Sequence, residues 1–273
     1  MNTAALSPYT YLRETLLLTW RGLRAITRVP ERLLDVTIQP IIFILLFLYV
    51  FGSAIHIPGV NYKTFMFPGI LAQSLAFGII GTGVATANDM REGVIDRFRS
   101  MPIGRLSIIS GQVLGQMCEQ LLGVIITVGL GLILGWRPHL TLTHGLELAG
   151  LIFLAMTAFT WCGVLFGMIV RSPDAMQGVG FIIVFPLSFM AGTFVPIAGM
   201  QLIPRTIGDW DPISAFVAAG RRLTANAHNA KALSSSGSWQ LDHPQIAVVI
   251  WCLLIIGICV PLALHRFNNT LAA

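Results

Sequence analysis

The sequence predicts an all-α integral membrane protein with six transmembrane helices, and three observations support this class. Apolar residues make up 55% of the 273-residue chain and charged residues only 11%, a composition too apolar for a soluble domain. Six apolar runs are each long enough for a helix to cross a bilayer, which takes about 20 residues. The runs lack the alternation of polar and apolar side chains that membrane barrel strands show. They cover 34–56, 65–87, 108–135, 146–170, 178–199 and 245–265, within one transmembrane domain of residues 1–273.

The segment before the first run, residues 8–30, is expected to form an amphipathic helix. Ser7 and Pro8 are typical of an N-cap and a first helical position, and Pro30 would end the helix. Its arginines gather on one face and its apolar residues, with Trp20, lie mostly on another. This pattern fits a helix lying in the membrane interface, and it also fits an amphipathic helix packed on the protein itself.

The basic residues predict the orientation. If the loops alternate between the two sides, eleven of the seventeen Lys and Arg residues fall on the side of the N-terminal segment and six on the other. Positive residues mark the cytoplasmic side, so both termini are expected in the cytoplasm of a multi-pass protein of the bacterial plasma membrane. The net charge of +5 is explained by this topology, and no nucleic-acid partner is expected.

The loop between the second and third runs, residues 88–107, is unusually charged. Seven charged residues fall between Asp89 and Arg105. Asp89 and Glu92 have the spacing of a capping box, and Pro102 would stop a short helix that begins there. A charged helix between two spans is suited to contact a soluble partner. The alternative is a solvated loop whose charges only set the topology.

Two further features concern packing. Gly163 and Gly167, like Gly111 and Gly115, have the spacing that lets membrane helices approach closely.

After the fifth run, an external loop is expected over 200–244. Two short apolar segments, at about 195–200 and 213–220, cannot cross a bilayer and are expected to be re-entrant or interfacial.

The chain lacks the motifs of common catalytic sites. Neither Lys63 nor Lys231 follows a glycine, so there is no Walker A loop, and no nucleophile elbow, zinc-protease motif or metal site is predicted. Glu119 is the one acid near the middle of a predicted span. An acid there is a candidate for a polar transport path, and it is also compatible with a hydrogen-bonded carboxyl that holds two helices together.

Three segments resemble permease subunits of type-2 ABC exporters, in the daunorubicin-resistance branch. The first is Glu92-Gly-Val-Ile-Asp-Arg-Phe-Arg-Ser-Met-Pro-Ile103, similar to a cytoplasmic family signature. The second is Ala191-Gly-Thr-Phe-Val-Pro196, at the exit of the fifth span. The third is Asp211-Pro-Ile-Ser214, before a segment that ends with Arg221-Arg-Leu223. Two features depart from the family pattern: Asp211 stands where an amide is common, and residues 226–243 lengthen the fifth loop.

The resemblance implies six spans, with re-entrant segments before the last one. It implies a dimer of permeases, identical or different, and two copies of a separate ABC ATPase subunit that binds ATP and Mg²⁺. No catalytic residue, cofactor site or metal site is expected in this chain. The residues implied to couple the chain to the ATPase are Glu92, Gly93, Asp96, Arg97, Arg99 and Pro102.

The expected function is therefore the permease subunit of an ATP-driven exporter, surrounded by membrane lipids, that moves lipids or hydrophobic drug-like molecules out of the cell. One alternative is a stand-alone secondary transporter or channel for a hydrophobic solute. Another is a membrane enzyme that acts on lipids, which would need a clustered nucleophile and base or a metal. The substrate and the role of Glu119 stay open at this level.

Overall fold

The computed structural model describes residues 11, 13–17, 19–20, 30–52, 55, 60–93, 105–170, 172–225 and 237–269. These residues form helices joined by turns, which confirms the all-α prediction for the described part of the chain. The long helices are α2 (Pro30–Leu46), α3 (Tyr62–Arg91), α5 (Arg105–Ile133), α6 (Leu142–Ile169), α7 (Pro173–Met190) and α12 (Pro244–Asn269).

Five of these helices, α3, α5, α6, α7 and α12, are long and apolar enough to cross a membrane. They correspond to the second to sixth predicted spans. The first predicted span, 34–56, corresponds to α2 and a continuing π-helical turn, η1 (Phe47–Phe51). Its apolar part, Thr37–Phe51, is shorter than the others. At 1.5 Å per residue it spans about 22 Å, less than a bilayer core of about 30 Å, so the sixth span stays a prediction.

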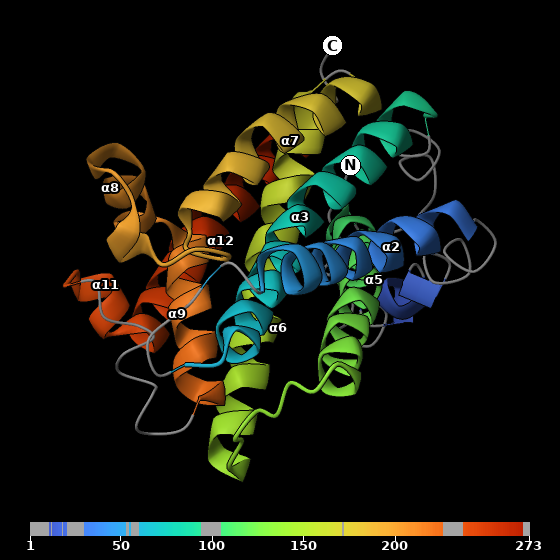
Figure 1. Ribbon diagram of the computed structural model, residues 1–273. Helices are drawn as coiled ribbons and strands as arrows, with labels where there is room; N and C mark the ends of the chain where they lie inside the picture. The colour runs from blue at the N-terminus through green and yellow to red at the C-terminus, as the bar shows by residue number, and fades with distance from the viewer. Residues whose placement is uncertain are drawn as a thin grey trace.

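The helix α3 lies at the centre of the body, with α5, α6, α7 and the short helix α9 (Pro212–Thr224) packed against it (Figure 1). The close approach of α3 to α6 depends on glycine residues of α6. A Cβ at Gly163 would lie 2.6 Å from the Ile79 carbonyl oxygen and 2.8 Å from the Thr82 Cβ. A Cβ at Gly167 would overlap the Gly83 carbonyl. The predicted small-residue packing is therefore confirmed for the α6 pair.

The helix α2 lies across α3 and α5 rather than alongside them (Figure 1). It carries Pro40 within the helix and ends in the wider turn of η1. Such π-helical turns leave i→i−4 hydrogen bonds unmade and are common near functional sites. The crossing brings Gln39, Pro40 and Phe43 of α2 close to residues of α3 and α5.

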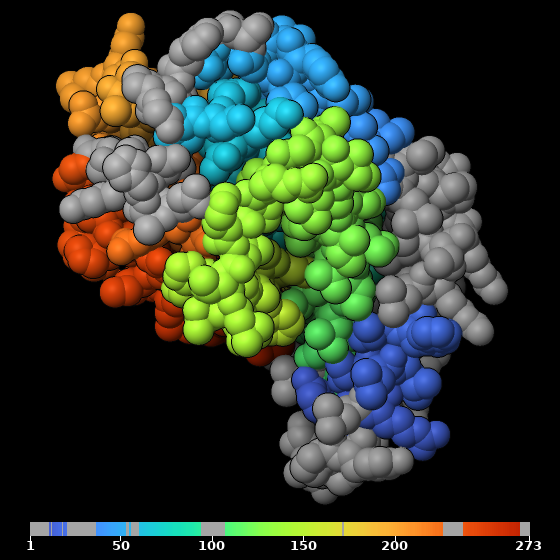
Figure 2. All heavy atoms as spheres, turned by 60° about the horizontal axis from the view of Figure 1, so that its bottom comes forward, coloured from blue at the N-terminus to red at the C-terminus, as the bar shows by residue number. Residues whose placement is uncertain are grey.

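The described part of the N-terminal segment is helical and packs on the start of α5, as Figure 2 shows. The Tyr11 and Ser110 hydroxyls share a hydrogen bond of 2.8 Å, and Thr19 donates to the Gly111 carbonyl at 3.4 Å. The opposite face exposes apolar side chains, Leu16, Leu17 and Trp20. The helix therefore contacts the protein on one face and presents an apolar face outward, while 8–10 and 21–29 lie outside the described residues.

The fifth span ends earlier than predicted. Ser172 caps α7 by accepting from the Ala175 amide at 3.2 Å, and Pro173 occupies the first turn. The helix stops at Met190, well before the expected residue 199, because the chain turns at Gly192, whose φ is +73°. A positive φ is accessible to glycine and strained for most other residues. The residues beyond form a turn and the short 3-10 helix η2 (Ile197–Gly199).

The described residues of the expected external loop, 200–244, form three more helices: α8 (Leu202–Trp210), α9 and α11 (Trp239–Asp242). Nearly every side chain of α9 is buried, between α3 and α12. A helix of this length cannot cross a bilayer but is enclosed by helices that can. This arrangement is compatible with the predicted re-entrant segment, which stays a prediction because no membrane boundary is defined. Residues 226–236, the middle of the lengthened loop, lie outside the described residues.

Candidate transport cavity and coupling region

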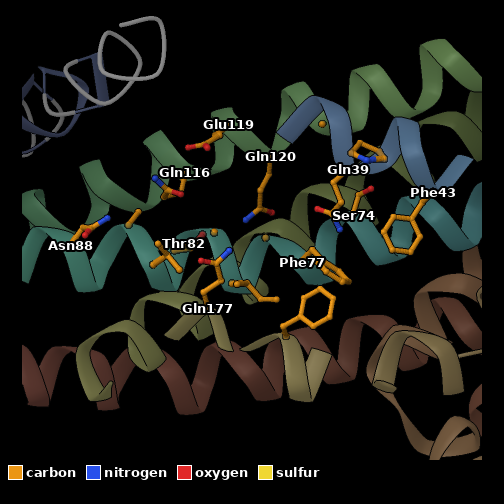
Figure 3. Close-up of a pocket in the computed structure, with 18 residues that line it drawn as sticks. Gln39, Phe43, Ser74, Phe77, Thr82, Asn88, Gln116, Glu119, Gln120 and Gln177 are labelled. Carbon is orange, nitrogen blue, oxygen red and sulfur yellow. The ribbon is translucent and has the colours of Figure 1, made fainter. Parts of the chain in front are cut away.

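A cavity of about 420 Å³ lies among α2, α3, α5 and α7. Its polar lining residues come from all four helices, and Figure 3 shows them gathered around one space. Amides and hydroxyls at helix positions inside a bilayer are unfavourable unless they meet polar partners or water, so their convergence marks a functional candidate. These residues are Gln39, Ser74, Thr82, Asn88, Gln116, Glu119, Gln120 and Gln177.

Helix α5 contributes three of these side chains: Gln116, Glu119 and Gln120. Residues three and four positions apart lie on one face of a helix, so all three face the cavity. The structure thus places the predicted intramembrane acid, Glu119, on the cavity wall, partly buried. It is the only charged residue among the residues that line the cavity.

Gln120 joins three helices beside the cavity. Its amide nitrogen donates to the Thr160 hydroxyl of α6 at 3.0 Å. Its side chain lies against Gly78 of α3, where a Cβ would overlap it. Its carbonyl oxygen is buried and has no hydrogen-bond partner among the described residues. An acceptor in this position is suited to a donor that enters the cavity.

The cavity also has an aromatic wall, formed by Phe43, Phe77 and Phe181. The Phe77 and Phe181 rings meet edge to face with centroids 5.9 Å apart, and the Phe43 and Phe77 centroids are 6.4 Å apart. The sequence did not single out these three residues by number. The available signal was the repeated four-residue spacing of phenylalanine, which aligns side chains on one helix face. The repeated residues are Phe43, Phe47 and Phe51 in α2 and η1, and Phe181, Phe185 and Phe189 in α7.

The two rows of phenylalanine meet beyond the cavity. Phe47 and Phe194 stack with ring centroids 3.5 Å apart, and Phe189 lies 4.9 Å from Phe194. Phe194 belongs to the turn after α7, within the segment that resembles the family motif. A continuous series of aromatic contacts therefore runs from the cavity to this turn.

Arg221 of α9 holds the same turn in place. Its guanidinium donates to the Phe65 carbonyl at 2.9 Å, the Gly192 carbonyl at 2.6 Å and the Thr193 carbonyl at 3.2 Å. It also lies 3.5 Å from the centroid of the Phe65 ring. Burial lowers the pKa of Arg221 to about 9, so the side chain is charged at neutral pH. The charge is compensated by carbonyl dipoles and a π-face.

Asp211, the departure from the family pattern, caps α9. Its carboxylate accepts from the Ile213 amide at 3.1 Å and from the Ser214 hydroxyl at 3.4 Å. The Asp211 carbonyl accepts from Gln240 at 2.7 Å, and Gln240 in turn accepts from Trp251 at 2.9 Å. Burial raises the pKa of Asp211 to about 7, although these hydrogen bonds to the carboxylate lower it. The carboxyl therefore titrates near neutral pH.

The coupling region is described only at its first residues. Glu92 is exposed at the end of α3, and its amide donates to the Asn88 carbonyl at 2.9 Å. Gly93 follows with a φ of +65°, the left-handed conformation that commonly ends a helix. The other predicted coupling residues, Asp96, Arg97, Arg99 and Pro102, lie outside the described residues.

The predicted helix start at Asp89 is wrong. Asp89 lies inside α3, which continues to Arg91. Its carboxylate accepts from the Gln112 amide at 3.1 Å, and the same amide donates to Thr86 at 3.2 Å. The capping-box spacing misled the prediction because the apolar helix before it does not stop where charged residues begin.

These features define a multi-pass helical membrane protein with a polar cavity inside an apolar body, a class that fits membrane permeases. The chain belongs to the ABC-2 type transporter family, whose model matches residues 13–223. The match covers the cavity helices and the predicted coupling region.

Two relatives are drug-resistance permeases. The chain is 27% identical over 262 residues to the daunorubicin resistance ABC transporter permease protein DrrB1 of Streptomyces coeruleorubidus, covering 95% of this chain and 88% of the relative. It is 26% identical over 213 residues to the doxorubicin resistance ABC transporter permease protein DrrB of Mycobacterium tuberculosis, covering 76% and 70%. The expected resemblance to the daunorubicin-resistance branch is confirmed.

Proposed function

We propose that this chain is the permease subunit of an ATP-driven exporter that moves hydrophobic drug-like molecules or lipids out of the cell. The observation that supports it most is the polar cavity of about 420 Å³ inside a chain of the ABC-2 type transporter family. A volume in this range is typical of sites for drug-sized ligands. The names of two relatives, which mention drug resistance, point to the same class of cargo.

The energy source in this proposal is a separate ABC ATPase, present in two copies, that binds ATP and Mg²⁺. A second permease, identical or different, completes the transporter. The chain lies in the bacterial plasma membrane with both termini in the cytoplasm. ATP binding closes the ATPase subunits, and the movement passes to α3 and α5 through the segment that joins them.

The segment that carries this coupling contains Glu92, Gly93, Asp96, Arg97, Arg99 and Pro102. The exposed Glu92 side chain supports the assignment, because it is placed to form ion pairs with a soluble partner at the end of a long, rigid helix. The α3 and α5 helices that flank the segment also line the cavity. A displacement at the coupling segment therefore reaches the cavity wall directly. Glu119, on that wall, lines the transport path.

Reversal of two charges tests the coupling. In the Glu92→Arg, Asp96→Arg double variant, we expect the permease to insert normally but to lose co-purification of the ATPase and ATP-dependent export. Glu147→Arg, an exposed acid on α6 outside this segment, is the matched control and should keep both. Normal ATPase binding and export by the double variant would refute the coupling assignment.

The alternative of a secondary transporter is tested in the same vesicles. Export that continues without nucleotide and collapses with the proton gradient would replace the proposed function with this alternative.

A further inference from the structure

The side-chain amide of Gln112 joins α5 to α3 near the ends that the coupling segment connects. Its nitrogen donates to the Thr86 hydroxyl at 3.2 Å and to the Asp89 carboxylate at 3.1 Å. Thr86 and Asp89 lie three positions apart, so they share one face of α3. Asp89 lies in the last turn of α3, and Gln112 lies about two turns into α5. We call these two hydrogen bonds the Gln112 bridge.

The Gln112 bridge lies just beyond one end of the cavity. Figure 3 shows Asn88 of α3 and Gln116 of α5 toward the same end of this space. Asp89 follows Asn88 in the chain, and Gln112 precedes Gln116 by about one helical turn. The bridge therefore lies between the cavity and the coupling segment. A displacement of that segment passes this level of α3 and α5 before it reaches the cavity.

The start of α5 is held from two sides. The Ser110 hydroxyl shares a hydrogen bond with Tyr11, and the next residue, Gly111, accepts one from Thr19 through its carbonyl. Both contacts reach the N-terminal helix, whereas Gln112 contacts α3. The Gln112 bridge therefore opposes a separation of α5 from α3 when a force acts on the coupling segment.

The α3 side of the bridge is packed into the body of the protein. Thr86 is fully buried, and its hydroxyl donates to the Thr82 carbonyl of its own helix at 2.8 Å. The Thr86 Cβ would lie only 2.7 Å from a Cβ built at Gly167 of α6. Hydrogen bonds between helices inside a bilayer have no water to replace them when they break. The bridge therefore ties α5 to a closely packed pair of helices.

We propose that Gln112 is a positioning residue for transport, which makes α3 and α5 move as one rigid pair, so that a movement of the coupling segment displaces both helices of the cavity wall together. This inference rests on the proposed function. It names a residue that lies outside the predicted coupling segment and outside the cavity lining. Without the bridge, the ATPase still hydrolyses ATP, but α5 separates from α3 and less cargo is exported per ATP.

The amount of cargo exported per ATP hydrolysed tests the bridge in the complete transporter. Gln112→Leu should lower this ratio about fivefold or more, the effect of two lost hydrogen bonds between helices, while co-purification of the ATPase stays normal. Thr127→Val is the matched control, because the Thr127 hydroxyl donates to the Gly123 carbonyl within α5 itself. An unchanged ratio in Gln112→Leu would overturn the proposal.

An exchange of donor and acceptor separates the hydrogen bond from the size of the side chain. Gln112→Glu alone should lower the ratio, because two carboxylates then face each other. The double variant Asp89→Asn, Gln112→Glu again places an amide donor opposite a carboxylate and should recover most of the ratio. If the double variant stays as low as Gln112→Glu, with the fold intact by size-exclusion chromatography, the assigned bridge is wrong.

A reversible cross-link distinguishes a rigid pair from a gate that must open. Asp89→Cys and Gln112→Cys, in a chain whose four native cysteines are replaced, are joined by a short bis-methanethiosulfonate and released by dithiothreitol. We expect the cross-link to restore the ratio that the free double variant loses. Export that stops on cross-linking and returns on reduction would mean that the helices must separate here, and would overturn the proposal.

A measurement on the permease alone keeps this inference separate from the proposed function. Spin labels at Arg91→Cys and Leu114→Cys, both exposed positions, report the distance between α3 and α5 in nanodiscs without ATPase or nucleotide. Gln112→Leu should broaden the distance distribution, and Thr127→Val should not. Equal distributions in the wild type and Gln112→Leu would overturn the bridge. A wild type without ATP-dependent export would instead refute the proposed function and leave the distance result standing.

Discussion

Arg221 shows how one residue can join three segments that are distant in the sequence. It donates to carbonyls of α3 and of the turn after α7 while belonging to α9. Only a planar guanidinium can direct several N–H groups at fixed angles, and an ammonium cannot reproduce this geometry. The turn that carries Phe194 is therefore positioned by a residue of α9.

Replacement of Arg221 by lysine tests this role. We expect Arg221→Lys to lower the free energy of unfolding by about 3 kcal/mol, because two charge-assisted hydrogen bonds are lost from a buried site. The measurement is thermal unfolding in detergent micelles. The neighbouring Arg222→Lys is the control, since Arg222 is exposed and donates a single bond, to the Asp242 carbonyl. Equal effects of the two substitutions would contradict the assigned role.

The raised pKa of Asp211 predicts that the stability of the folded protein depends on pH. Its folded-state pKa of about 7 lies above the ordinary value of 3.8, so the folded protein binds more protons between these pH values. The free energy of unfolding should therefore fall as the pH rises from about 4 to 7, by about 4 kcal/mol at most, and stay level above. Asp211→Asn keeps an acceptor for the Ile213 amide and removes the charge.

The measurement compares the melting temperatures of the wild-type protein and the Asp211→Asn variant at about pH 5 and pH 8. The wild-type protein should be less stable at the higher pH, and Asp211→Asn should lose most of this difference. Asp209→Asn serves as the control, because Asp209 is only partly buried and pairs with Arg205 on the surface of α8. A pH profile of Asp211→Asn that matches the wild type would refute the assignment.

At the scale of elements, the contact between α3 and α6 depends on two glycines. Alanine at Gly163 or Gly167 would place a methyl group against the α3 backbone, and overpacking of this kind destabilises by about 1–3 kcal/mol. Gly150 provides a matched control on the same helix, because no atom lies within 4 Å of a Cβ built there. Its replacement by alanine should leave stability unchanged or slightly raised, since alanine favours helix.

Thermal unfolding of the three alanine variants measures this difference. Gly163→Ala and Gly167→Ala should melt earlier than the wild type, and Gly150→Ala should not. If all three melt alike, the glycines are not needed for the close approach of α3 and α6.

For the whole molecule, the orientation of the chain is the central prediction. Glu92 lies at the end of α3, whereas His139 lies in the exposed connection between α5 and α6. Helix α5 separates these regions by about 42 Å, enough to place them on opposite sides of a bilayer. Single cysteines at the two positions, with the four native cysteines replaced, therefore report the topology.

In intact cells, a membrane-impermeant maleimide should label His139→Cys and not Glu92→Cys. Permeabilised cells should show labelling at both positions, which controls for reactivity. Labelling of Glu92→Cys in intact cells would place the coupling segment outside, away from any cytoplasmic ATPase, and would refute the proposed function.

The sequence by itself determined the local properties of the chain. The apolar runs predicted five long helices that the structure confirms. Three short motifs indicated a resemblance to type-2 ABC transporter permeases, which the family match confirms. Glycine spacing in α6 predicted a close contact because both residues lie on one helix face. These features depend on neighbouring residues, and hydropathy and helical periodicity report them directly.

Only the tertiary structure decided which polar side chains meet. Gln39, Gln120 and Gln177 come from three helices far apart in the sequence, and no local pattern brings them to one cavity. The burial of Arg221, which the charge count had placed in an external loop, likewise follows from the enclosure of α9 by longer helices. Helix pairing is set by packing between distant segments, so cavity and buried cation exist only once the helices have assembled.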